Sequence, residues 1–217
     1  MTSPLWHWLE PRASGGEFEH FFCGPAAGSM PPCPNCRAPL LVYAQFDPRD
    51  RRLGLGELGV AQVNCVFCWR CALAQAPLHY RLSAEGSVEL LSFGRGAVEV
   101  DFPYPDYPRA FPRAALVLVE PTPRELGALE QIRAGALWHD LEPDLRHLLV
   151  PRHRAGPGLA SQVRSHACAL CGKAMTGFAV FGNSNLDPRG FTGSESAEVG
   201  FQACVACAAV AAVQWCD

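Results

Sequence analysis

Short stretches in which apolar and polar residues alternate recur along this chain and predict β-strands. One pair covers roughly residues 39–46 and 60–67, and Val63, Cys65 and Phe67 fall on one face of the second stretch, as a half-buried strand requires. A polar stretch containing glycines separates the two, which predicts a hairpin with a long connection.

The same alternation in the middle of the chain predicts a meander. Strands are expected at Leu78–Leu82, Val88–Phe93 and Val98–Asp101, with glycine-containing turns between them. Another strand is expected at Ala115–Glu120.

Two short helices are predicted after these strands. Thr122-Pro-Arg-Glu125 has the spacing of a capping box with proline at the first helical position, so a helix should begin there and run to about Ala134. Pro143 begins a second helix that ends near Leu149.

Three stretches show no periodic pattern. Residues 1–32 are rich in Gly, Pro and aromatics and are predicted to be irregular, and residues 151–166 have the composition of a basic linker. Residues 102–112 hold four prolines, which exclude a helix or a central strand. The aromatics on this segment either pack on the sheet as a strap or form a partner-binding edge.

A cysteine motif occurs twice and is the strongest chemical pattern in the chain. Each copy has a Cys-x2-Cys pair leading into a strand and a second Cys-x2-Cys pair after the returning strand, with 31 residues between the pairs in one copy and 32 in the other. The first set is Cys33, Cys36, Cys68 and Cys71, and the second is Cys168, Cys171, Cys204 and Cys207.

Two such pairs, repeated, predict two structural Zn2+ ions, each held by four thiolates. The first copy is ambiguous because Cys65 and Cys68 also form a Cys-x2-Cys pair. In the register of the repeat, however, Cys65 corresponds to Phe201, an apolar strand position, so we assign it to the core. Cys23 and Cys216 have no counterpart in the repeat and are interpreted as small thiols without a metal role.

The sequence disfavours two other uses of the paired thiols, disulfides and redox chemistry. Disulfides need an oxidising compartment, and the first ten residues have neither a basic region nor a long apolar run typical of a secretory signal. A redox dithiol is usually a single Cys-x2-Cys that opens a helix, whereas here the first pair of each copy leads into a strand. The chain is therefore expected to be cytoplasmic and to bind zinc.

Composition limits the classes of partner. The chain has 217 residues, 49% of them hydrophobic and only 18% charged, with a formal net charge of −3. A mildly acidic chain is a poor candidate for nonspecific binding to phosphate backbones, which depends on Lys and Arg. No apolar run is long enough to span a membrane.

Candidate catalytic groups are sparse. The segment His139–His147 gathers two histidines and three carboxylates that could bind metal or perform acid–base chemistry, but Pro143 interrupts it and nothing fixes its geometry. Arg152 and Arg154 could contact a phosphate, although two arginines on a linker are more often solvated. No nucleotide-binding or hydrolase motif is present.

The order of a Gly-Pro loop, a Cys-x2-Cys pair, an amphipathic strand, a long hairpin and a second pair resembles the YwqG-like bacterial proteins and the programmed cell death protein 2 family. The stretch Cys33–Gln45 is the most similar, and the segments His20–Pro25 and His153–Pro157 resemble degraded forms of the family's "GG-x-P-x-W" segment. The resemblance covers about 80 residues in two blocks, and the chain departs from the family at the second glycine and the tryptophan. It implies protein binding, as a dedicated chaperone or as an immunity partner of a bacterial toxin.

The sequence thus predicts a β-rich α+β fold with two zinc-ribbon-like units related by an internal repeat. The expected parts are 1–76 with the first unit, 77–150 with the meander, the proline-rich loop and the helices, and 151–217 with the second unit. The predicted function is a non-enzymatic, immunity-like or chaperone-like protein-binding module of bacterial type. The alternatives are a nucleic-acid-binding zinc ribbon and, third, an enzyme that uses the His139–His147 cluster.

Overall fold

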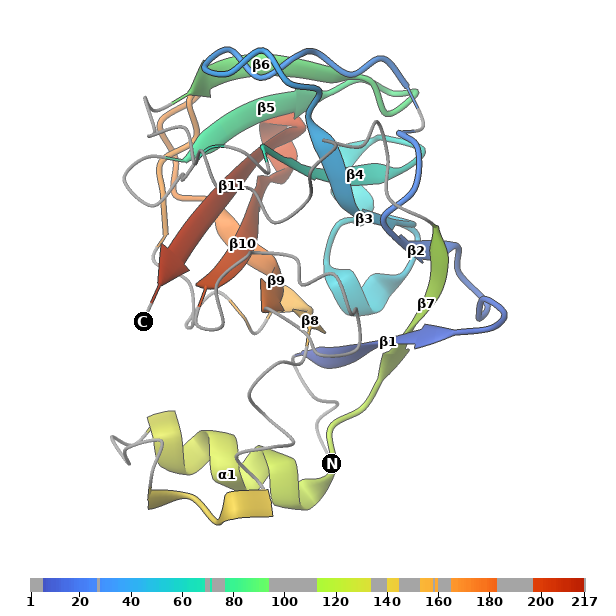
Figure 1. The fold of residues 1–217 in the computed structure, drawn as a ribbon, viewed down its shortest axis with the longest axis vertical. Coiled ribbons are helices and arrows are strands. Elements are labelled where there is room, and N and C mark those ends of the chain that lie inside the picture. The colour runs from blue at the N-terminus through green and yellow to red at the C-terminus, as the bar shows by residue number, and fades with distance from the viewer. Residues whose placement is uncertain are drawn as a thin grey trace.

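The computed structural model describes residues 6–26, 28–68, 71, 77–93, 113–133, 140–144, 153–157, 159, 165–182 and 197–216. Within these residues the chain is built almost entirely of antiparallel strands (Figure 1). The strands are β1 (His7–Arg12), β2 (His20–Phe22), β3 (Leu41–Phe46), β4 (Val63–Phe67), β5 (Leu78–Leu82), β6 (Val88–Phe93), β7 (Ala114–Val119), β8 (Arg154–Ala155), β9 (Thr176–Gly182), β10 (Ala197–Cys204) and β11 (Ala209–Cys216). The helix α1 (Pro123–Arg133) and the 3-10 turns η1 (Arg51–Leu53), η2 (Gly56–Leu58) and η5 (Val205–Cys207) complete the described elements.

All eleven strands belong to one sheet, in the order β4-β3-β2-β7-β1-β8-β9-β10-β11-β5-β6, which curls into a nearly closed barrel. The prediction of an α+β fold with separate zinc-ribbon units was therefore wrong. A ribbon hairpin would keep free edges, but β2 pairs with the outer edge of β3 and β8 pairs with that of β9. These two strands are only three and two residues long, too short to leave an alternating pattern in the sequence.

The two cysteine-bearing hairpins have the same register, including the position of a bulge. Ala44 is opposite Cys65 in the first hairpin and Ala179 is opposite Phe201 in the second, so Cys65 and Phe201 occupy equivalent places as expected. In each hairpin the register shifts by one residue of the leading strand, at Tyr43 in the first and at Phe178 in the second.

This equivalence extends beyond the motif that the sequence revealed. Cys23 donates its backbone N–H to Tyr43 O, as Gly156 does to Phe178 O, so β2 is equivalent to β8 and His20 to His153. Strand β7 pairs with β2 as β1 pairs with β8.

Strands β1 and β7 join the two halves. They pair with each other in a register centred on Glu10 and Val117, in which Trp8 is opposite Val119 and Arg12 is opposite Ala115. Exchanging the two strands reproduces the same register, so an internal twofold axis passes through the Glu10–Val117 pair.

The barrel closes between β4 and β5 through side chains. Tyr80 on β5 is fully buried, and its hydroxyl donates to Asn64 O at 2.9 Å and accepts from Val66 N at 3.1 Å. Asn64 Nδ2 donates to Gly86 O in the turn after β5 at 2.6 Å. The edge of β4 is thus satisfied by side chains instead of by a neighbouring strand.

Helix α1 begins where the capping box was predicted. Glu125 Oε2 accepts from Thr122 N at 2.7 Å, and Thr122 Oγ1 accepts from Glu125 N at 3.3 Å. Ala128 packs in a small apolar cluster with Trp6, Trp8 and Val180. The greater part of the predicted helix 143–149 lies outside the described residues.

The other predicted elements have mixed outcomes. Strands β5 and β6 have the predicted bounds, and the strand predicted at 115–120 is β7. Residues 1–32 are not irregular throughout, because they include β1 and β2, and the stretch predicted as a linker includes β8. The predicted strand 98–101 and the proline-rich segment 102–112 lie outside the described residues, and the three-part division stays a prediction.

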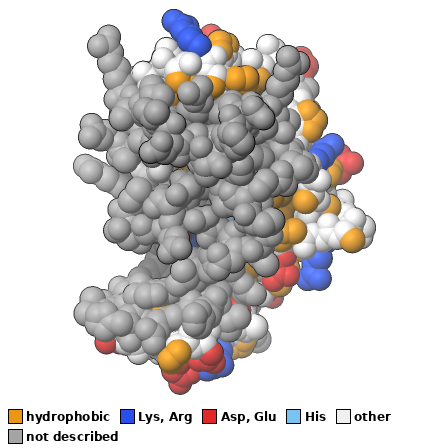
Figure 2. Space-filling view, in the orientation of Figure 1, with side chains coloured by type: hydrophobic (Ala, Val, Ile, Leu, Met, Phe, Trp, Pro, Cys, Tyr) orange, Lys and Arg blue, Asp and Glu red, His pale blue; other side chains and the backbone are white. Residues whose placement is uncertain are grey.

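None of the helices in the described part of the chain combines the length and apolar character that crossing a membrane would need. At the end of the molecule that carries α1, acidic and basic side chains stand next to one another (Figure 2). Arg124 pairs there with Glu142, and with Asp144 at 2.8 Å.

Candidate metal centres and an arginine-lined cavity

The eight cysteines selected from the repeat lie in two groups of four. Within each group the Sγ atoms all lie within 4.8 Å of one another. In the first group Cys33 Sγ is 3.8 Å from Cys71 Sγ, and Cys36 Sγ is 3.5 Å from Cys68 Sγ. In the second group Cys171 Sγ is 3.7 Å from Cys204 Sγ.

Matching turns before β3 and β9 position the first pair of each group. Arg37 donates its N–H to Cys33 O, and Gly172 donates to Cys168 O, both at 2.9 Å. In the opposite direction, Cys33 donates its backbone N–H to Ala38 O, and Cys168 donates to Lys173 O. Arg37 has φ 65° and Gly172 has φ 71°, so a left-handed residue closes each turn, and glycine meets this need without strain in the second copy.

These distances suit a tetrahedral zinc–thiolate site. With Zn–S bonds of about 2.3 Å, two sulfurs of a tetrahedron lie about 3.8 Å apart. A disulfide would need an S–S distance of about 2.0 Å, so the thiols are not paired in that way. The donor set therefore fits two metal ions, and their identity as zinc stays a prediction.

Charge within the first group also favours a cation. A hydrogen bond with Cys68 lowers the pKa of Cys33 to about 5, whereas burial raises the pKa of Cys71 to about 12. Four adjacent thiols cannot all ionise against mutual repulsion, and a dication removes that repulsion.

The two groups differ in their surroundings. Cys33, Cys68 and Cys71 are buried in the main core, and Asn35 Nδ2 donates to Cys71 Sγ at 3.2 Å. The second group lies in a smaller cluster with Met175, and its Cys171 is exposed. Access to solvent is therefore greater at the second group.

Two of the cysteines outside the repeat lie in the core. Cys65 is fully buried on β4, and burial raises its pKa well above the usual range. Cys23 is also buried. The side chain of Cys216 lies outside the described residues.

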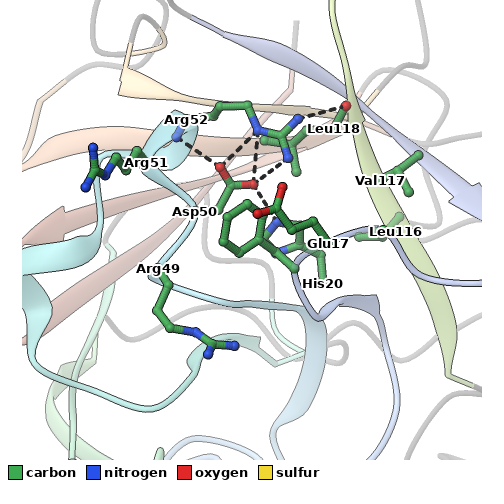
Figure 3. Close-up of a pocket in the computed structure, with 11 residues that line it drawn as sticks. Glu17, His20, Arg49, Asp50, Arg51, Arg52, Leu116, Val117 and Leu118 are labelled. Atoms are coloured by element: carbon green, nitrogen blue, oxygen red, sulfur yellow. Dashed lines mark hydrogen bonds and ion pairs between the residues drawn. The ribbon is translucent and has the colours of Figure 1, made fainter.

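A cavity of about 580 Å³ opens beside the junction of β2 and β7. Its floor includes Leu116, Val117 and Leu118 of β7, and Phe18 contributes to the lining. Figure 3 shows that Arg49, Arg51 and Arg52 spread out in different directions from one loop around Asp50, and that Arg52 reaches toward Leu118 of β7.

Buried aspartates hold two of these arginines. Arg52 makes a bidentate contact with Asp50, with Nη2 at 2.7 Å from Oδ2 and Nε at 2.9 Å from Oδ1. Arg49 contacts Asp47 in the same way, with Nη2–Oδ2 at 2.5 Å. Both aspartates are at most 4% exposed, whereas the arginine side chains are 76% (Arg49) and 41% (Arg52) exposed. The guanidinium groups thus face outward from a fixed anionic base.

His20 completes this network in a defined protonation state. Its Nδ1 accepts from Asp47 N at 3.1 Å, so the ring proton is on Nε2, which donates to Asp50 Oδ2 at 2.9 Å. Burial lowers the pKa of His20. Burial also opposes ionisation of Asp50, but hydrogen bonds from Arg52 and His20 outweigh it and lower the pKa of that carboxyl. Neutral His20 beside ionised Asp50 is the stable state.

Sequence reasoning missed this cavity. One sequence pattern could have indicated the arginine–aspartate pairs: in the run Asp47-Pro-Arg-Asp-Arg-Arg52, each aspartate is followed two residues later by an arginine. His20 lies 30 residues from Asp50, and no local pattern connects them.

Of the residues named for the two alternative functions, most lie outside the part of the chain that the structure describes. His139, His147 and Arg152 lie outside the described residues. Arg154 does not lie on a solvated linker: it is part of β8, only 13% exposed, and pairs with Glu198 at 2.9 Å.

Comparison with known proteins gives no relative from which a role could be transferred. No protein-family model, no curated protein and no solved structure matches the chain.

Proposed function

We propose that this protein is a zinc-stabilised, non-enzymatic protein-binding module of the cytoplasm, immunity-like or chaperone-like. The observation that carries the proposal is the pair of closed four-cysteine groups, which leave no ligand position for water or substrate. Structural zinc sites have this composition, whereas catalytic sites keep one open position.

The described polar network supports a non-enzymatic role. Both ring nitrogens of His20 are engaged, by Asp47 N and by Asp50, and the ring is 2% exposed. A histidine in this state cannot take a proton from a substrate, and Asp50 is occupied by Arg52.

The resemblance to the YwqG-like and programmed cell death protein 2 families supports protein binding in particular. It rests on the cysteine turns and the strands that follow them, which both halves of the barrel preserve. Membership of either family is part of the proposal.

The described candidate that the sequence offered for nucleic-acid binding, Arg154, gives that function no support. Arg154 is neutralised by Glu198, and the chain has a net charge of −3.

The proposal is tested by native mass spectrometry of the full chain, purified from its own host at low and at high salt. We expect two zinc ions per chain and a stoichiometric protein partner. A chain that carries zinc but turns over a substrate in an activity screen, with no partner bound, would contradict the proposal.

A further inference from the structure

We propose that the cavity between the Asp47–Arg52 loop and β7 binds an acidic side chain, Asp or Glu, of the protein partner. This inference rests on the proposed function and names the chemistry of the partner at one point of contact.

The free polar groups on the loop side of the cavity are mainly donors. Asp47 and Asp50 are occupied by Arg49, Arg52, His20 and backbone N–H groups. The Arg51 side chain is exposed and makes no hydrogen bond or ion pair with the described residues, whereas its backbone O accepts from Gly54 N at 3.2 Å. A group that supplies acceptor oxygens fits these donors best, and a carboxylate matches guanidinium geometry.

The arginines are held in place before any ligand arrives. Because Asp47 and Asp50 are buried beneath them, Arg49 and Arg52 lose little side-chain freedom when they meet a second anion. The buried carboxylates balance much of the charge of Arg49 and Arg52, and Figure 3 shows the guanidinium groups of Arg49, Arg51 and Arg52 around the cavity with the Glu17 carboxylate beside Asp50.

The cavity suits a side chain with an apolar stem. The half-buried side chains of Val117 and Phe18 line it, whereas Leu116 and Leu118 are buried in the main core, and its volume of about 580 Å³ exceeds the needs of a single carboxylate. Strand β2 pairs with β7 only as far as Leu116, which leaves the space beside Val117 and Leu118 open. Arg52 Nη1 reaches into that space and donates to Leu118 O at 3.3 Å.

Glu17 is the competing anion. It lines the same cavity, is exposed, and contributes an attractive charge interaction with Arg52. A partner's carboxylate would have to share the guanidinium groups with it. The proposal therefore predicts opposite effects for two neutralising substitutions, Arg51→Gln and Glu17→Gln.

The test uses the full chain labelled with 15N and a capped pentapeptide, acetyl-Ala-Leu-Glu-Leu-Ala-amide, with the Gln version of the peptide as its control. Binding is followed by the side-chain Nε–Hε signals of the arginines. We expect the Glu peptide to shift the signals of Arg49, Arg51 and Arg52 and the Gln peptide to leave them in place. Arg51→Gln should weaken binding about threefold and Glu17→Gln should strengthen it about threefold. Arg81→Gln, an exposed arginine on β5 outside this cavity, should leave it unchanged.

Three results would overturn the inference. Equal binding of the Glu and Gln peptides would show a purely apolar site. Shifts with inorganic phosphate but not with the Glu peptide would show the wrong anion. Unchanged partner affinity in Arg51→Gln, with the natural complex intact, would remove the cavity from the interface while leaving the protein-binding function standing.

Discussion

At the scale of single residues, two equivalent buried histidines face different surroundings. His20 has its partners in the Asp47–Asp50 loop. His153 packs against Phe22 and Phe181 with ring centroids 5.0 and 5.3 Å away. Burial lowers the pKa of His153 to about 3. Its neutral form is therefore part of the folded state.

This makes stability depend on pH with a definite sign. Below the unfolded-state pKa of about 6.5 the unfolded chain binds a proton at this position that the folded chain does not, so stability falls as pH drops from about 6.5 toward 3. For His153 alone the loss between pH 7 and pH 5 should be about 2 kcal/mol. The free energy of unfolding can be measured by urea denaturation at both pH values. Its change between pH 7 and pH 5 should be smaller by this amount in His153→Phe than in the wild type. Equal pH dependence in the two proteins would contradict the assignment.

Metal ligation separates neighbouring cysteines at the same scale. Cys65→Ser replaces a core thiol and should leave two zinc ions bound, at a stability cost of about 1–3 kcal/mol for a buried hydroxyl. Cys71→Ser should lose one zinc ion. Native mass spectrometry counts the ions directly, and the reverse outcome would mean that Cys65 is the ligand.

At the scale of elements, the two cysteine turns are built alike but shielded differently. In the first, Cys33 is buried in the main core and Cys36 is half-buried, while the second presents Leu170, 48% exposed, and an exposed Cys171. Ligand exchange at a zinc site requires access by the incoming chelator or alkylating reagent.

The exposed turn should therefore lose its metal first. On titration with a strong chelator in the presence of iodoacetamide, Cys171 and Cys207 should be alkylated before Cys33 and Cys71, as mapped by peptide mass spectrometry. Simultaneous alkylation of both groups would show that shielding does not control release.

The Tyr80 hydroxyl makes two of the hydrogen bonds that close the barrel. Tyr80→Phe leaves Val66 N–H and Asn64 C=O without this buried partner, at an expected cost of about 1–3 kcal/mol. Hydrogen exchange at Val66 should accelerate. The equivalent Gln202 on β10 lies between two strands and should keep its protection, which provides an internal control.

The elements also show what the sequence could and could not predict. Cysteine spacing and strand alternation are local, so the four-thiol groupings and the equivalence of Cys65 with Phe201 could be predicted. The pairing of β7 between β2 and β1 involves residues about 100 positions apart, and β2 is only three residues long. Such long-range pairing leaves no periodic pattern, which is why a continuous sheet was mistaken for separate ribbons.

At the scale of the whole molecule, the continuous sheet couples the two metal centres. The hairpin of β3 and β4 at one centre is connected to the hairpin of β9 and β10 at the other through the hydrogen-bonded strands β2, β7, β1 and β8. Loss of one centre should therefore destabilise the entire barrel instead of one part of it.

Cys171→Ser tests this coupling. Metal-binding free energy at such a site is folding free energy, so we expect a lowered melting temperature with a single cooperative transition. Circular dichroism and alkylation of the buried Cys65, which lies on β4 in the other half of the sheet, should report the same midpoint. Two separate transitions would show that the halves unfold independently.

The twofold relation centred on Glu10 and Val117 has a consequence for the origin of the chain. One half, with a single metal centre, would expose a strand whose antiparallel partner is its own copy. That is the self-complementary interface of a homodimer. The present chain has the architecture expected when the gene for such a dimeric ancestor is duplicated and fused, after which each copy could diverge, one toward a shielded metal centre and the other toward an accessible one.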